Sequence, residues 1–191
     1  MQNLFFSPGL AETSANHTFQ IFNSGSGSVN APFTGHALIR VWGQGATGGA
    51  SGPDSGGGAG GYTEVYVSVT SGDSFPWAVG SPSTVTGPGG LSLSATAGAG
   101  TGGGSGSGGD TNLSGGSGTS AGSKNGGSGG AAPNGVRQGP VPWGGSGGGG
   151  GGKDDDGSSG GAPGGGGGGA GKDASTGGTG AAGRIVFIWT K

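Results

Sequence analysis

The sequence has no cysteine and few charged side chains, and these two absences exclude several classes of protein. Without cysteine there is no disulfide framework and no thiolate metal site. Only 8% of the residues are charged and the formal net charge is −2, so no basic surface for nucleic acid is expected. The longest run of large apolar residues, 185–189, is far shorter than a membrane span. We therefore expect neither a nucleic-acid partner nor insertion into a membrane.

Apolar side chains are also scarce, because glycine takes their place. Apolar and aromatic residues make up 28% of the chain, whereas glycine alone supplies 59 of the 191 residues and proline another 10. An ordinary α/β enzyme of this length needs a larger apolar fraction to fill its core. A disordered chain usually carries more net charge than this one. The composition favours neither class, so the positions of the glycines become the informative feature.

Glycine is concentrated in one part of the chain. Residues 98–183 hold 40 of the 59 glycines, while nearly all apolar residues precede residue 97 or belong to the last few positions. This distribution divides the sequence into four parts. They are an N-terminal arm or anchor (1–31), a β-strand part (32–97), a glycine-rich part (98–183) and a closing strand of the same domain (184–191).

Alternating and branched residues predict β-strands on both sides of the glycine-rich part. In residues 62–69, Thr63 and the three alternate valines after it face one side, and Tyr62 begins the opposite face. Residues 185–189 are all apolar, which predicts a central strand that is covered on both faces. No segment has the pattern of an α-helix. Further short strands are expected at residues 19–22, 37–42, 75–79 and 91–96.

The glycine-rich part is either a flexible linker or a packed bundle. Glycine disfavours both helix and pleated sheet, since it supplies no side chain to pack. The predicted strands tie the segment at both ends, and so long a structureless loop is unusual inside a compact domain. Extended polyglycine-II helices, with three residues per turn, let glycine backbones approach and hydrogen-bond to one another. We therefore predict an all-β fold, in which a small antiparallel, jelly-roll-like β-sandwich encloses or flanks a polyglycine-II bundle.

Motifs for catalysis and metal binding are weak. Residues 43–48 match the dinucleotide pattern G-x-G-x-x-G, but their glycine-rich continuation cannot form the helix that this pattern requires. Neither His17 nor His36 stands at metal-ligand spacing from an acidic residue. The triplet from Asp154 to Asp156 offers oxygen ligands for Ca²⁺, yet its spacing is not that of an EF-hand, and a solvated loop is the alternative. We expect no enzyme activity, cofactor or metal.

Four tryptophans add information about the core and the surface. Trp42, Trp77 and Trp189 lie in or beside apolar strands, so we expect them in the core. Trp143 instead ends the longest interruption of the glycine-rich part, residues 131–143. Aromatic and arginine side chains on a rigid loop are typical anchors of an interface, and packing of Trp143 against the bundle is the alternative.

Several short segments, taken in order, resemble the glycine-rich domain of bacteriophage tail and fibre proteins. They are Pro-Phe-Thr at 32–34, Ala-Leu-Ile-Arg-Val-Trp-Gly-Gln-Gly-Ala at 37–46, Gly-Gly-Ala-Gly-Gly-Tyr-Thr-Glu at 57–64, Val-Thr-Ser-Gly-Asp at 69–73, Val-Gly at 79–80, Gly-Ala-Pro at 161–163 and Gly-Arg-Ile-Val-Phe-Ile-Trp at 183–189. The layout is similar to that of the glycine-rich domain of anaplastic lymphoma kinase receptors. It also resembles the tip adhesins of T-even-like long tail fibres, in which loops between polyglycine helices bind the receptor.

The resemblance implies a non-enzymatic virion protein of the tail fibre, tail or capsid surface. Its partners would be other virion proteins and a bacterial surface receptor, protein or glycan; a homotrimer is left open. The alternative is a structural decoration or spike protein without receptor binding. Leu4, Phe5 and Phe6 are the candidate virion anchor, with a frayed terminus or an additional edge strand as the alternative for residues 1–31. The candidate receptor-binding residues are Asn134, Arg137, Gln138, Trp143, Lys153, Asp154, Asp155, Asp156, Lys172 and Asp173.

A further class, an ice-binding bundle, requires a flat face rich in threonine. No such face is evident from the order of residues alone.

Overall fold

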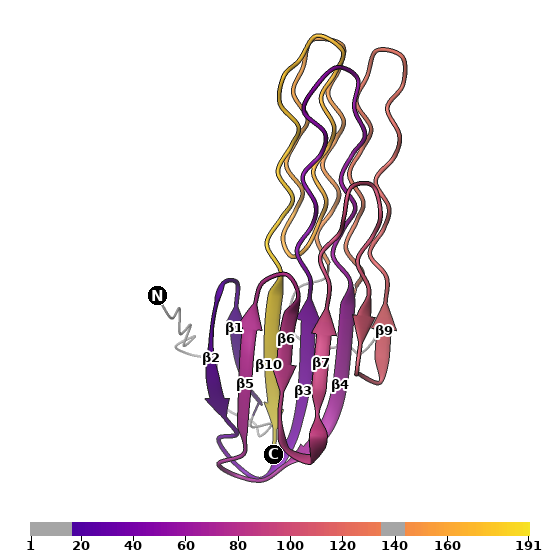
Figure 1. The fold of residues 1–191 in the computed structure, drawn as a ribbon. Helices are drawn as coiled ribbons and strands as arrows, with labels where there is room; N and C mark the ends of the chain where they lie inside the picture. Colours follow the sequence, from indigo (N-terminus) through magenta and orange to yellow (C-terminus); the bar gives the residue numbers. More distant parts are fainter. Residues whose placement is uncertain (1–16, 135–143) are drawn as a thin grey trace.

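The chain forms two antiparallel β-sheets with a glycine-rich bundle at one end, as seen in a computed structural model that describes residues 17–134 and 144–191 (Figure 1). The all-β prediction is confirmed, and the described residues contain no α-helix, only the 3-10 turn Pro88–Gly90. Sheet A contains, in order, β1 (His17–Phe22), β10 (Arg184–Thr190), β3 (Gly35–Trp42), β4 (Tyr62–Val69) and β9 (Thr111–Leu113). Sheet B contains, in order, β2 (Gly25–Asn30), β5 (Ser74–Val79), β6 (Ser83–Thr86), β7 (Ser92–Ala95) and β8 (Gly106–Ser107).

The predicted boundaries between the four parts of the chain shift in the structure. β1 and β2 lie within the predicted N-terminal arm, and both are edge strands, as the alternative interpretation of that segment had it. The short strands β8 and β9 lie within the predicted glycine-rich part. Residues 43–61, assigned to the β-strand part, instead leave the sandwich and return to it as part of the bundle (Figure 1). After the turn at 70–73 the chain crosses from sheet A to sheet B.

The main core fills the space between the two sheets. β4 alternates as predicted, with Val65 and Val69 in this core and Tyr62 on the other face of sheet A. β10 is an interior strand, between β1 and β3, and its residues 185–189 are buried on both faces, as the sequence predicts. Phe187 and Trp189 stack with ring centroids 5.4 Å apart, and Phe75 of sheet B packs against both.

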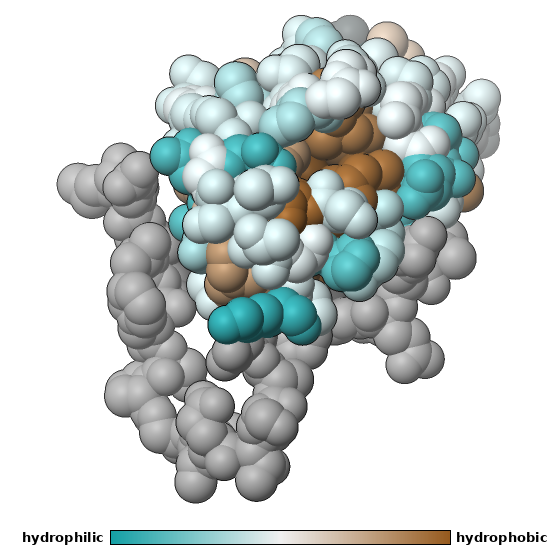
Figure 2. All heavy atoms as spheres, turned by 90° about the horizontal axis from the view of Figure 1, so that it is seen from below, coloured by the Kyte–Doolittle hydropathy of each residue, from teal (hydrophilic) through white to brown (hydrophobic). Residues whose placement is uncertain are grey.

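The end of the sandwich opposite the bundle is closed by partly buried apolar side chains. Figure 2 views this end and shows apolar atoms surrounded by polar ones. Phe33 in the β2–β3 connection and Leu91 in the β6–β7 connection pack against the main core here. β1 begins at this end, since His17 lies opposite Thr190, the residue before the last one of the sequence. The chain therefore enters and leaves the sandwich far from the outer end of the bundle.

Backbone hydrogen bonds hold the bundle together. Around an inner segment, the direction in which successive N–H groups point repeats after three residues. In the buried segment 164–171, Gly166 and Gly169 donate to residues 130 and 127 of one neighbouring segment. Gly167 and Ala170 donate to residues 46 and 49 of a second neighbour. Gly168 and Gly171 donate to residues 158 and 155 of a third. Successive N–H groups therefore point in three directions, each repeated after three residues.

The same inner segment accepts hydrogen bonds from three further neighbours. Their donors are Gly57 in segment 54–61, Gly148 in segment 144–152 and Gly178 in segment 176–182. Six segments thus surround residues 164–171. At most inner glycines an added Cβ would lie closer than 3.0 Å to backbone atoms of a neighbouring segment, so a larger residue would force the segments apart. Glycine is required here for the close approach of one backbone to another.

Candidate functional site at the tip of the glycine bundle

Turns from separate hairpins of the bundle meet at its outer end, which we call the bundle tip. They comprise residues 51–54, 122–125, 153–156 and 172–174, at the top of Figure 1. Backbone hydrogen bonds connect them, since Lys172 donates to Lys124 O at 3.0 Å and Asp173 donates to Lys153 O at 2.8 Å. The turn at 51–54 is attached through the Asp54 N–H, which donates to Ala170 O at 3.1 Å. The tip is therefore one continuous surface, although its residues are far apart in the sequence.

Lys153 is the electrostatic centre of this surface. Its Nζ lies 2.6 Å from Asp173 Oδ2 and 3.2 Å from Asp154 Oδ1. The hydrogen bond from Lys153 lowers the pKa of Asp173, and the hydrogen bonds to Asp173 and Asp154 raise the pKa of Lys153. All three side chains are about half exposed or more. The structure thus brings together three of the candidate residues, from two different turns.

The acidic triplet does not converge on a single point. Asp154 turns to Lys153, whereas Asp156 Oδ1 accepts a hydrogen bond from the Thr176 N–H at 3.0 Å. Within the described ranges, no group of three or more histidine or acidic side chains is arranged to hold a metal ion. The Asp156 side chain therefore connects the turn at 153–156 to the segment that begins at Thr176, while Asp154 contacts its own neighbour Lys153.

The tip contains two further charged residues that were not among the predicted site residues. Lys124 is exposed beside Lys172, and Asp54 lies in the first turn, where its Oδ1 accepts the Ser55 N–H at 2.7 Å. Each is a charged residue in a turn between two glycine segments, which is the same sequence signal that identified Lys153 and Lys172.

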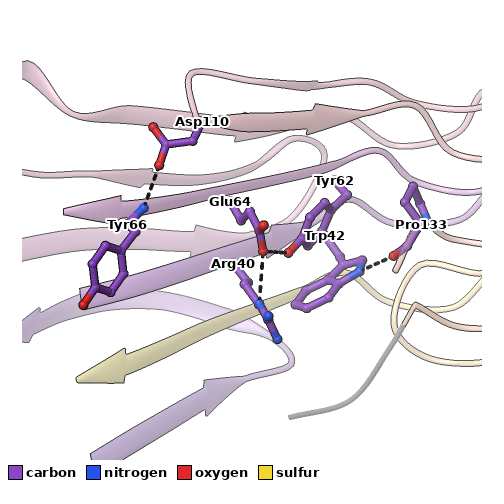
Figure 3. Close-up of polar contacts among 7 residues, drawn as sticks. All are labelled: Arg40, Trp42, Tyr62, Glu64, Tyr66, Asp110 and Pro133. Atoms are coloured by element: carbon purple, nitrogen blue, oxygen red, sulfur yellow. Dashed lines mark hydrogen bonds and ion pairs between the residues drawn. The ribbon is translucent and has the colours of Figure 1, made fainter. Parts of the chain in front are cut away.

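Asn134 is separated from the other candidates. It lies at the sandwich end of the bundle, exposed, and its Oδ1 accepts the Gly144 N–H at 2.9 Å. The neighbouring Pro133 carbonyl accepts the indole N–H of Trp42 at 2.9 Å (Figure 3). The other predicted residues, Arg137, Gln138, Trp143, Leu4, Phe5 and Phe6, lie outside the described residues.

A buried polar cluster lies on the outer face of sheet A, next to the sandwich end of the bundle. Glu64 Oε2 accepts the Tyr62 hydroxyl at 2.5 Å and faces Arg40 Nε at 3.3 Å, and all three residues are buried (Figure 3). Burial and the adjacent Glu64 raise the pKa of Tyr62. Tyr62 also packs against Trp42, with centroids 4.8 Å apart. The cluster joins β3 to β4 where the chain leaves for the bundle, so its observed role is structural.

The long sides of the bundle carry small side chains in columns. Segments 43–50, 96–99 and 176–182 are hydrogen-bonded side by side, through Gly98 to Gln44 O and Gly48 to Gly178 O. Every third residue of these segments is exposed, and because the segments are adjacent, their exposed side chains form neighbouring columns, a surface that we call the column face. Its residues are Gln44, Thr47, Ala50, Thr96, Ala99, Thr176, Thr179 and Ala182. Two of the threonines are hydrogen-bonded to neighbouring segments, since Thr96 Oγ1 accepts the Ser105 N–H and Thr179 Oγ1 bonds to Ser159 Oγ.

No protein-family model matches the chain, and no curated protein matches it. In the part of the chain that the structure describes, no helix is long and apolar enough to cross a lipid bilayer.

Proposed function

We propose that the chain is a non-enzymatic bacteriophage virion protein, a component of the tail fibre or tail tip, and that the bundle tip recognises the host cell surface. The observation that carries this proposal is the geometry of the tip. Charged turns from separate hairpins form one surface at the end of the molecule farthest from where the described chain begins and ends. Attachment at one end and recognition at the other is the arrangement that a tail protein needs.

The bundle is proposed to consist of polyglycine-II helices, which would give the tip a rigid support. The three-residue rotation of the hydrogen bonds supports this assignment, because polyglycine II has three residues per turn. A rigid support lowers the entropy that the recognition turns lose on binding. A chain of this composition can then present charged side chains on a scaffold that needs almost no apolar core.

Binding of purified protein to bacterial cells tests the proposal. The probe is the full chain, labelled, on cells of the host of the phage from which the sequence derives. We expect saturable binding and competition with phage adsorption. Absence of both would refute the proposed function, whereas incorporation into particles without cell binding would favour the decoration or spike alternative.

Variants at the tip then locate the binding surface. Lys124→Glu and Lys172→Glu reverse two exposed charges at the tip without removing a hydrogen bond of the bundle, since both residues bond through their backbone. Lys191→Glu makes the same change at the opposite end of the molecule and is the matched control. We expect each tip variant to bind cells with a dissociation constant raised about tenfold or more, which corresponds to about 1.4 kcal/mol. The control variant should bind as tightly as the natural chain. Equal binding by all three would move the receptor site away from the tip.

The column face makes ice binding the second candidate function. The structure places four exposed threonines and three alanines on this face, which the sequence alone did not reveal. A thermal hysteresis assay with Thr179→Lys as the variant tests it. Freezing-point depression by the natural chain that the variant loses would support this candidate, and no hysteresis would end it.

A further inference from the structure

Within residues 17–134 and 144–191, β2 is an edge strand of sheet B, and the backbone edge that faces away from β5 has no partner strand. It pairs with β5 on one side only, at the left of Figure 1. Its residues are exposed except Val29. Among the described residues, the only backbone hydrogen bonds of β2 are those of its ladder with β5. An unpaired strand edge of this kind is a template for another strand.

A proline in β5 determines which residues of β2 point their backbone groups to the free edge. Ser28 lies opposite Pro76. Because proline has no N–H, this pair cannot exchange the two hydrogen bonds of a bonded antiparallel position. The bonded positions are therefore the odd-numbered residues, and Ala31 confirms the parity, since it donates to Asp73 O at 2.8 Å. By alternation, the N–H and C=O groups of Ser26, Ser28 and Asn30 point outward.

The side chains of β2 leave this edge unprotected. Gly27 packs over the indole of Trp77 and Val29 lies in the core, so the even-numbered residues face solvent. The strand contains no charged residue and no proline. Charged residues, proline and bulges are the devices that usually prevent edge strands from pairing, and the first two are absent from β2.

We propose that β2 pairs with β2 of a second copy of this chain, antiparallel across a two-fold axis centred on Ser28. In this register Ser28 lies opposite Ser28 of the second copy, and Ser26 lies opposite Asn30. These are the residues whose backbone groups point outward, so each pair exchanges two hydrogen bonds. A second copy is the occupant because the strand is self-complementary about Ser28 and has no charge to repel across the axis. The two bundle tips then point in opposite directions.

Sedimentation velocity on the full chain across a concentration series tests the dimer. We expect the natural chain to dimerise and Ser28→Pro to raise the dissociation constant by roughly tenfold or more, because the central donor of each copy is lost. The bonds between β2 and β5 survive this change, since the Ser28 N–H does not point to β5. Circular dichroism verifies that the variant folds.

A charge pair provides a second test that does not rely on proline. Ser28→Lys alone and Ser28→Glu alone place like charges opposite each other, so each is expected to be monomeric, while their mixture forms a heterodimer. Ser92→Lys, at an exposed position of β7 in the same sheet, is the matched control and stays dimeric. A monomeric natural chain at every soluble concentration overturns the proposal, as does a trimer or a dimer that both Ser28 variants leave intact. None of these outcomes depends on whether the tip binds cells.

Discussion

Replacing Gly167 by alanine tests whether the bundle depends on direct contact between backbones. Gly167 lies in the buried inner segment, and a Cβ added there would lie closer than 3.0 Å to the carbonyl oxygen of Gly178. The obstructing atom is backbone, not the end of a flexible side chain. Segment 176–182 therefore has to move away from the inner segment.

The cost of that movement follows from the hydrogen bonds that it breaks. Three bonds join these segments, and the two nearest to Gly167 run from Gly178 to Gly168 O at 2.7 Å and from Ala181 to Gly165 O at 2.8 Å. The third, from Gly164 to Ala182 O at 2.9 Å, lies at the sandwich end of the bundle and is expected to survive. Leaving buried polar groups unpaired costs about 1–3 kcal/mol for each lost bond. Alanine offsets about 0.4–1 kcal/mol of this loss in stability, because it lowers the conformational entropy of the unfolded chain relative to glycine. We expect the free energy of unfolding to fall by about 2–5 kcal/mol.

Gly149→Ala is the matched control in an adjacent segment. The nearest atom to a Cβ added at Gly149 is Ser158 Oγ, at 3.9 Å, so this alanine fits without movement. Its expected effect is between zero and a gain of about 1 kcal/mol. Urea denaturation followed by tryptophan fluorescence measures both variants, and amide hydrogen exchange of residues 164–171 detects loosening confined to the bundle. Equal stability and equal exchange in the two variants would refute backbone contact as the basis of the bundle.

Three further predictions concern the sandwich, the tip and the bundle. Glu64→Gln should lower the free energy of unfolding by about 3 kcal/mol or more in urea denaturation, because it removes the carboxylate charge that faces the buried guanidinium of Arg40. The pKa of Asp173 is lowered in the folded state, so its contribution to stability is present above the ordinary carboxyl range and lost as pH falls through the folded pKa. An NMR titration of Lys153→Met should show the pKa of Asp173 returning to that range. Amides of residues 164–171 should exchange more slowly than those of the exposed turn at 153–156, and random-coil rates in the inner segment would contradict the packed bundle.

The strands that the sequence predicted are those whose side chains encode their environment. β4 alternates between a core face and an outer face, and β10 is apolar throughout because both of its faces are covered. Such patterns are local, so they can be read without knowing the partner strand. β2 and β6 were not predicted, since glycine, serine and threonine dominate them and neither is strongly apolar. Pairing with neighbouring strands places these segments in sheet B, and that information is not local.

In the candidate site, too, local features could be predicted from the sequence, whereas the contacts between distant segments could not. That charged residues interrupting the glycine segments would form turns was foreseeable, because glycine segments must reverse direction to remain in one domain. Which turns meet was not foreseeable, since the pairing of Lys153 with Asp173 depends on the register of hydrogen bonds between whole segments. The separation of Asp154 from Asp156 has the same cause, as each is tied to a different neighbour.

The packing of the bundle also restricts where a functional side chain can stand. In an inner segment all three directions of the repeat meet another backbone, so glycine is needed at nearly every position. In an outer segment one residue in three points to solvent, and there the described chain places mainly serine, threonine and alanine, with Gln44 as the larger exception. The other described bundle residues larger than threonine lie in turns at the tip or at the sandwich end. Backbone packing takes the place of a hydrophobic core in the bundle and leaves little room for large side chains along its length. The exposed charged side chains of the bundle are therefore concentrated at the tip, where they can contact a partner.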